Sequence, residues 1–135
     1  MRLTADELSR FGEALGRQLR PPVVLGLSGD LGTGKTTLVQ ALCRGLGAAG
    51  PVTSPTYALV HRYETAQGVP VYHVDGYRLR SPGDARDLGF DDMIRERAVV
   101  LIEWPERAGP WVPPLDRHLR LSFDADPHRR TVEEA

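Results

Sequence analysis

The chain has 135 residues, of which 41% are hydrophobic and 26% are charged. This length fits one compact domain spanning residues 1–135, and the composition is that of a folded chain, not of a disordered one. Seventeen Lys and Arg residues against eighteen Asp and Glu residues give a formal net charge of -1. A near-neutral balance excludes a protein that coats polyanions through bulk positive charge.

The sequence lacks the patterns that are typical of a membrane span, a secretory signal or an internal disulfide. No apolar run reaches the ~20 residues that a membrane span needs, and the first ten residues lack the apolar segment of a secretory signal. The single cysteine, Cys43, has no second cysteine for an internal disulfide. We therefore expect a cytoplasmic protein with no disulfide partner and no membrane contact.

The first helix is expected over residues 4–19. Thr4 and Glu7 have the spacing of a capping box. Leucines follow at helical spacing, and Pro21 and Pro22 end the pattern. A single amphipathic stripe of this kind predicts a helix that packs on one face only.

The next segment reads as a strand, a glycine-rich loop and a helix. Val23–Ser28 is a nearly continuous apolar run, which is typical of a strand buried on both faces of a parallel sheet. The loop that follows leads into an expected helix over residues 35–46, and Gly47 suits its C-terminal cap.

The remaining elements are shorter. The sequence predicts, in order, a loop over 51–56, strands over 57–63 and 69–75 around a turn at 66–68, helical turns over 81–94, a buried strand over 98–103, an irregular proline-rich stretch over 104–114, a strand over 118–123, and a tail that forms a last strand or frays.

These elements predict a three-layer α/β domain of the P-loop NTPase type. The hairpin in the middle implies that its central sheet is mixed.

Residues 29–36, GDLGTGKT, match the phosphate-binding pattern G-x-x-x-x-G-K-[ST]. The glycines allow positive φ, so that backbone N–H groups and the following helix N-terminus converge on an anion. Lys35 brings a positive charge to the β- and γ-phosphates, and the Thr36 hydroxyl is a hard oxygen ligand suited to Mg²⁺. The expected nucleotide-binding residues of this segment are Asp30, Leu31, Gly32, Thr33, Gly34, Lys35, Thr36 and Thr37.

Two apolar runs end in an acidic residue. VYHVD ends at Asp75, and VVLIE ends at Glu103. A P-loop site needs a carboxylate at a neighbouring strand end to hold Mg²⁺ or to orient water. Both residues are therefore candidates, and their spacing does not decide which of them holds the metal.

Several classes of P-loop protein share this phosphate-binding pattern, and other features of the sequence distinguish them. The N-K-x-D and D-x-x-G patterns of GTPases are absent from the sequence, which disfavours guanine specificity. A small-molecule kinase needs a lid and a substrate pocket, for which 135 residues leave little room. Two interpretations remain: an ATPase, and a nucleotide-gated binding module whose hydrolysis of ATP is incidental.

Five blocks in series resemble the TsaE (YjeE) family: GDLGTGKTT, SPTYALVHRYE, VYHVDGYRL, DLGFDDMI and LIEWPER. The resemblance covers residues 4–123. It implies a small cytoplasmic ATPase with weak intrinsic activity that serves bacterial tRNA N6-threonylcarbamoyladenosine (t6A37) synthesis. The implied partners are the TsaD and TsaB proteins, with tRNA reached only through their complex, and the implied role of ATP hydrolysis is to reset that complex.

The resemblance also implies roles for single residues. Thr36 and Glu103 match the family's Mg²⁺ ligands, and Asp75 matches an aspartate by the γ-phosphate that is a candidate for orienting water. Trp104 matches a tryptophan beside the nucleotide. The switch-like S-P-T-Y loop corresponds to Ser54, Pro55, Thr56 and Tyr57. One departure is Gly76, where the family usually has a large apolar residue, and this suggests a looser turn.

Overall fold

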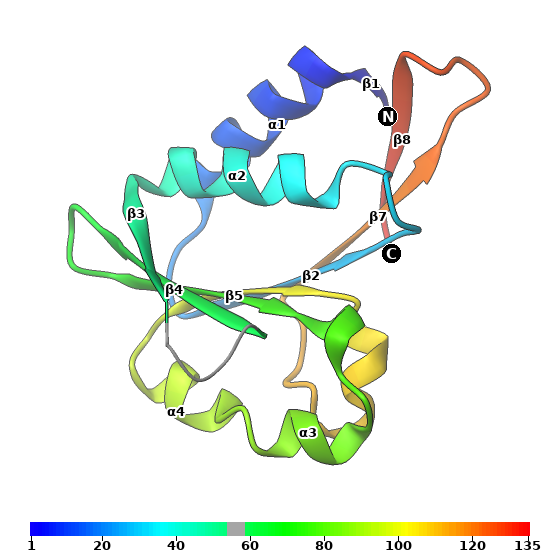
Figure 1. The fold of residues 1–135 in the computed structure, drawn as a ribbon. Helices are drawn as coiled ribbons and strands as arrows, with labels where there is room; N and C mark the ends of the chain where they lie inside the picture. The colour runs from blue at the N-terminus through cyan, green and yellow to red at the C-terminus, as the bar shows by residue number, and fades with distance from the viewer. Residues whose placement is uncertain (54–58) are drawn as a thin grey trace.

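The computed structural model describes residues 1–53 and 59–135, and in this part of the chain one eight-stranded sheet lies between two layers of helices (Figure 1). The strands are β1 (Arg2–Thr4), β2 (Val23–Ser28), β3 (Ala48–Thr53), β4 (Val60–Thr65), β5 (Pro70–Asp75), β6 (Val99–Glu103), β7 (Arg117–Phe123) and β8 (Arg129–Glu134). The helices are α1 (Ala5–Gln18), α2 (Lys35–Leu46), α3 (Pro82–Arg86) and α4 (Phe90–Arg95), with 3₁₀ helices η1 (Gly76–Arg78) and η2 (Pro105–Trp111).

The sheet is mixed, as the sequence predicts. Its order is β1-β8-β7-β2-β6-β5-β4-β3. The four central strands, β7, β2, β6 and β5, run parallel to one another, and antiparallel strands flank them on both sides. The carboxyl ends of the central strands therefore meet at one edge of the sheet, where α/β proteins bind their ligands.

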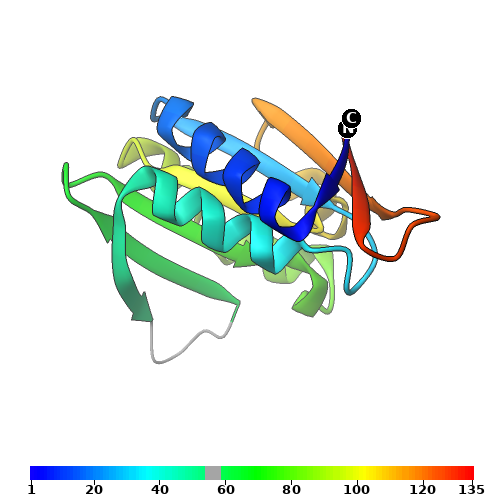
Figure 2. The same ribbon diagram turned by 90° about the horizontal axis from the view of Figure 1, so that it is seen from above.

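Helices cover both faces of the sheet, which confirms the three-layer α/β class. Helices α1 and α2 lie together on one face, whereas α3 and α4 lie on the other (Figures 1 and 2). Thr4 caps α1, and the predicted capping box with Glu7 is present in both directions. Gly47 caps α2 at φ 75°, again as the sequence predicts.

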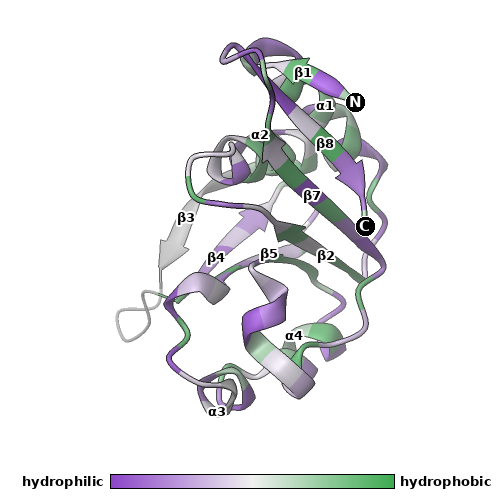
Figure 3. Cartoon of the chain, turned by 90° about the vertical axis from the view of Figure 1, so that its right-hand side faces the viewer, coloured by the Kyte–Doolittle hydropathy of each residue, from purple (hydrophilic) through white to green (hydrophobic). Residues whose placement is uncertain are grey.

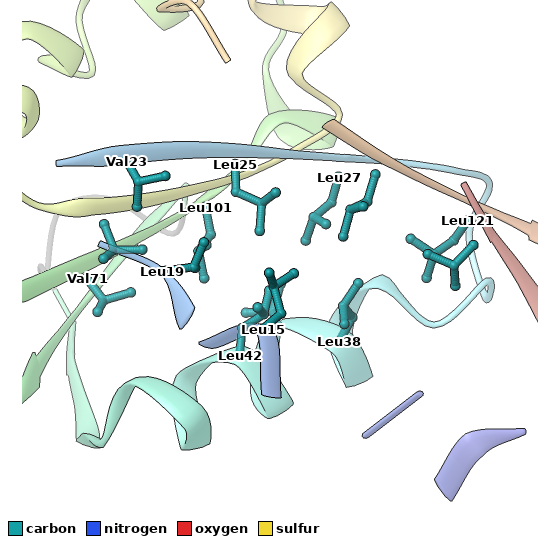
Figure 4. Packing of buried hydrophobic residues seen from close by; sticks show 14 of the residues in the cluster. Leu15, Leu19, Val23, Leu25, Leu27, Leu38, Leu42, Val71, Leu101 and Leu121 are labelled. Carbon is teal, nitrogen blue, oxygen red and sulfur yellow. The ribbon is translucent and has the colours of Figure 1, made fainter. Parts of the chain in front are cut away.

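The apolar strands supply two cores, one on each face. Along β2, Leu25 and Leu27 point to the α1 and α2 face (Figure 4), whereas Val24 packs on the opposite side. Strand β6 alternates in the same way, with Leu101 on the first face and Ile102 on the second. This is why β2 has no polar alternation, and Figure 3 shows hydrophobic colouring along much of it.

Glycines let α1 and α2 approach closely. A Cβ added at Gly16 of α1 would collide with the carbonyl oxygen of Leu42, and one added at Gly45 of α2 would collide with that of Glu13. A Cβ at Gly12 would lie 2.6 Å from the Cβ of Ala41. The two helices are thus held backbone to backbone, which fixes α2, and with it the loop before α2, against the sheet.

Two expectations about the edges of the sheet are wrong. The loop expected over 51–56 is strand as far as Thr53, because β3 is an edge strand and tolerates Pro51 where one side needs no hydrogen bond. Strand β1, which the sequence did not predict, forms because Arg2–Thr4 pairs with the tail strand β8. The tail is therefore a strand and does not fray.

No helix in residues 1–53 and 59–135 is both long and apolar enough to cross a membrane.

The close contact of α1 with α2 predicts an unusual effect of adding a methyl group. Gly→Ala in a helix normally stabilises by roughly 0.5–1 kcal/mol. Gly16→Ala should instead destabilise the protein by about 1–3 kcal/mol, because the methyl group overpacks the interface. Gly83→Ala is the matched control, since the nearest atom to its Cβ, 3.6 Å away, is a serine side-chain oxygen. Urea unfolding measures both, and a stabilised Gly16→Ala variant would refute the close contact.

Candidate phosphate-binding site

The glycine-rich loop of residues 29–34 leaves the carboxyl end of β2 and enters α2. Strand β2 lies between β6 and β7, so the loop sits at the centre of the edge where the parallel strands end. Glu103 ends β6 and Asp75 ends β5, and the two residues are paired directly in the sheet register. Three chemically active segments from distant parts of the sequence therefore converge on one place.

The loop has the backbone conformation that its glycines allow. Gly29 and Gly34 have φ values of 143° and 102°, which side chains disfavour. Gly34 is the N-cap of α2 and provides no side-chain hydrogen bond to the helix. The first N–H groups of α2 therefore face the loop without a capping side chain, as in a helix N-terminus that binds an anion. Thr33 is fully buried, and its hydroxyl donates to the Asp30 carbonyl oxygen at 2.6 Å.

Lys35 is nearly buried, with 5% of its surface exposed. Its ammonium donates to the carbonyl oxygens of Gly29 and Asp30 at 2.5 and 2.9 Å. Burial lowers the pKa of Lys35, and the charges of Glu103, Asp30 and Asp75 oppose this shift. The ammonium is thus held inside the curl of the loop, where the phosphates of a nucleotide would meet it.

The two carboxylates have different surroundings. Glu103 is one of the few buried charged residues, and its Oε2 lies 2.6 Å from Nε2 of His73. Asp75 is more exposed, accepts a hydrogen bond from the Tyr77 N–H at 3.2 Å, and lies 3.4 Å from the Arg78 guanidinium. One carboxylate is therefore nearly buried and bound to a histidine, whereas the other caps η1 and is 30% exposed.

Trp104 has strained backbone beside these groups. Its φ of 54° is uncommon for a large residue, and it places the indole ring 5.1 Å from Nζ of Lys35. The ring also lies 5.4 Å from Tyr77, and the Arg107 guanidinium lies 4.7 Å from the Tyr77 ring. Strain of this kind costs about 1–3 kcal/mol, and it concentrates at functional sites.

These residues enclose a cavity of about 340 Å³. Its lining consists of Leu31, Gly32, Gly34, Lys35, Thr36, Thr37, Asp75, Tyr77, Glu103 and Trp104. A larger hollow, of about 470 Å³, lies at the opposite end of the strands near Leu19, Leu46 and Val69. That hollow is mainly apolar and has neither a carboxylate nor a glycine-rich turn in its lining, so the smaller cavity is the better candidate for phosphate chemistry.

The oxygen donors of the cavity fit Mg²⁺. This ion is usually held by one or two carboxylates together with substrate phosphates and waters. The Thr36 hydroxyl and the Glu103 carboxylate line the same cavity, with Asp75 beside them. Among the described residues, no group of three or more His, Cys, Asp or Glu side chains is placed to hold a metal ion. These protein oxygens therefore suit a cation that binds together with a phosphate, which supplies further ligands.

The structure brings most of the residues expected from the sequence to this cavity, with two exceptions. Asp30 lines a neighbouring cavity that shares only Trp104 with the first, and Thr33 supports the loop from inside. The expected switch residues, Ser54, Pro55, Thr56 and Tyr57, lie outside the described part of the chain. Sequence reasoning overlooked Arg107, which the block LIEWPER contains, because an exposed arginine gives no signal of its stacking partners.

The turn at Gly76 is tight, not loose as the sequence suggested. Gly76 is buried, and an added Cβ would collide with the backbone carbonyl oxygens of Glu103 and Trp104. The glycine therefore lets η1 close over the end of β6. This contact keeps Asp75 and Tyr77 next to Glu103 and Trp104.

Comparison with known proteins gives a consistent family. The sequence model of the family described as "Threonylcarbamoyl adenosine biosynthesis protein TsaE" matches residues 3–132. The tRNA threonylcarbamoyladenosine biosynthesis protein TsaE of Haemophilus influenzae is 37% identical over 128 residues, covering 90% of this chain and 80% of that protein. The protein of the same name from Treponema pallidum is 36% identical over 126 residues, covering 93% and 92%.

A solved structure agrees with this relationship. The crystal structure of Bacillus subtilis YdiB superposes with a TM-score of 0.77 at 27% identity, covering 100% of this chain and 83% of that one. The mixed three-layer fold is thus that of a P-loop NTPase-like domain. The chain belongs to the TsaE family, whose members take part in tRNA threonylcarbamoyladenosine biosynthesis.

Proposed function

We propose that this protein is an Mg²⁺-dependent ATPase and that it works as an accessory subunit of the t6A37 modification machinery. In this proposal the hydrolysis of ATP to ADP and phosphate drives or resets a complex of the TsaD and TsaB proteins. The observation that carries the proposal is the convergence of a buried ammonium, an uncapped helix N-terminus and two strand-end carboxylates on one cavity.

Each residue has a physical task in this reaction. Lys35 and the N–H groups of the loop neutralise and orient the β- and γ-phosphates of ATP. Little covalent chemistry is then required of the protein, because phosphoryl transfer depends mainly on positioning and charge neutralisation. The aromatic ring of Trp104 lies 5.1 Å from the Lys35 ammonium, within the range of a cation–π contact.

Glu103 and Thr36 would hold the cation, and Asp75 would orient the attacking water. The bound Mg²⁺ supplies charge stabilisation to the transferred phosphoryl group. Two features support this division of labour. Glu103 is buried and held by a hydrogen bond, which suits a ligand of fixed position, whereas Asp75 is 30% exposed and therefore accessible to water.

The near-neutral charge of the chain supports a role in which tRNA is reached through protein partners. The described residues build the sheet, its two helical layers and the phosphate cavity, and the chain has a formal net charge of -1. Extensive tRNA contact depends on many Lys and Arg residues at phosphates. We therefore propose that tRNA is reached through the TsaD–TsaB complex and that the protein acts in the cytoplasm.

Replacing the ammonium should remove most of the nucleotide affinity. Lys35→Ala leaves the phosphate charge without its partner, and we expect a loss of about 2–5 kcal/mol in ATP binding. Isothermal titration calorimetry measures this loss. Arg95→Ala removes the same charge from an exposed pair with Asp92 and should bind ATP like the wild type. Unchanged affinity in Lys35→Ala would defeat the phosphate-site assignment.

Removing the charge of Glu103 should affect hydrolysis more than binding. Glu103→Gln keeps the shape of the side chain but weakens the metal site, which should lower the rate of phosphate release by about 100-fold, the equivalent of about 2.7 kcal/mol in the activation free energy. ATP affinity should fall much less, because Lys35 and the loop remain. Glu96→Gln, at the exposed end of α4, serves as the control. Equal losses in binding and hydrolysis would show that Glu103 acts only in ground-state binding.

The partner role separates an ATPase from a nucleotide-gated binding module. Purified TsaD–TsaB should stimulate ATP hydrolysis by this protein, and multiple-turnover formation of t6A37 should require ATP. A non-hydrolysable analogue should permit complex formation but not repeated turnover. If repeated turnover proceeds equally well with the analogue, hydrolysis is incidental and the binding-module function is correct.

A further inference from the structure

His73 makes the hydrogen bond that holds the Glu103 carboxylate. Its Nε2 lies 2.6 Å from Oε2 of Glu103, and the two side chains are 13% and 10% exposed. Within residues 1–53 and 59–135, this is the single hydrogen bond to the Glu103 side chain. A short contact between two nearly buried polar groups sets the position of both.

The sheet register produces this contact. Asp75 of β5 pairs with Glu103 of β6, and His73 pairs with Leu101. Side chains two residues apart on a strand point to the same face, so that His73 and Glu103 are diagonal neighbours on the face that carries Leu101 and α2. The imidazole therefore approaches Glu103 from inside the sheet, whereas the P-loop approaches it from the open edge.

With Glu103 ionised, as a carboxylate that binds a cation must be, the proton of this contact lies on Nε2 of His73. An ionised carboxylate only accepts hydrogen bonds. Nε2 must therefore carry the N–H, whether the imidazole is neutral or positively charged. This N–H takes one of the two acceptor sites of Oε2, whereas Oε1 has no hydrogen-bond partner among the described residues and is the freer oxygen for another ligand.

We propose that His73 is a positioning residue that donates from Nε2 to Oε2 of Glu103 and so presents Oε1 to the divalent cation. This inference rests on the proposed Mg²⁺-dependent function. Groups that hydrogen-bond to metal ligands fix the ligand orientation, and removing them typically lowers metal affinity by about 10- to 100-fold. His73 itself contributes no bond to the cation in this arrangement.

A neighbouring histidine provides a matched control. His61 of β4 is paired with His73 in the sheet, and their rings are stacked with centroids 6.0 Å apart. His61 therefore has the same side chain in adjacent surroundings, but its described hydrogen bonds do not include one to Glu103. A general effect of imidazole packing would appear in both residues, whereas a positioning effect would appear only in His73.

The test compares glutamine with asparagine at position 73, because their side-chain amides differ in length by one methylene group. In His73→Gln the side-chain amide nitrogen can occupy the position of Nε2 and donate to Glu103. In His73→Asn the amide ends near the position of Nδ1 and falls short. His73→Leu removes the donor entirely, and His61→Leu is the control. Electron paramagnetic resonance measures the binding of Mn²⁺, used in place of Mg²⁺, to each variant saturated with ADP, while calorimetry measures ADP binding in EDTA.

We expect Mn²⁺ affinity to fall by about 10- to 100-fold in His73→Leu and His73→Asn and to recover in His73→Gln. ADP binding in EDTA and all values for His61→Leu should match the wild type. If His73→Leu does not fold, as judged by thermal melting, the comparison of Asn with Gln decides. Equal Mn²⁺ affinities in those two variants, or wild-type affinity in folded His73→Leu, would overturn the positioning role while leaving the ATPase intact. A wild-type protein that binds ADP but no Mn²⁺ would overturn both.

Discussion

A single buried ammonium organises the functional end of this molecule. Lys35 is the only lysine in the chain, and it lies inside the glycine-rich loop, bound to two loop carbonyls and covered by an indole ring. Burying a charge is unfavourable unless it is paired. Here the partners are backbone dipoles and the nearby carboxylates. In the proposed function, a polyphosphate would provide the stronger partner for this charge.

Contacts from the helices and from the sheet hold that loop in place. Gly16 and Gly45 bring the backbones of α1 and α2 together, and a Cβ at Gly29 would collide with the carbonyl oxygen of Leu121 in β7. The loop is therefore fixed from the helical layer and from the sheet. On its other side, Gly76 closes η1 over the end of β6. These contacts give the site a fixed geometry without a large domain, and the strain at Trp104 is stored where such packing can support it.

The sequence predicted the features that depend on neighbouring residues. Three predicted features depend on local sequence: the capping box at Thr4, the cap at Gly47 and the conformation of the glycine-rich loop. The structure confirms the capping box and the cap. Strand β1 and the strand character near Pro51 depend on pairing with distant segments, and there the local signals misled. The site follows the same division. Strand-end carboxylates were visible in the sequence, but the contact of His73 with Glu103 joins residues 30 positions apart and follows from the strand register.

The central claim is that the ammonium of Lys35 meets the phosphates of a nucleotide. Because the chain has one lysine, protein made with ¹³C,¹⁵N-lysine gives one set of lysine signals in a nuclear magnetic resonance spectrum, and each ε signal reports on this site alone. Titration with ATP and with inorganic tripolyphosphate should shift the ε signals to saturation, whereas adenosine should leave them in place. If ATP binds, as calorimetry can establish independently, and the ε signals of Lys35 do not move, the nucleotide lies elsewhere and the account of the site is wrong.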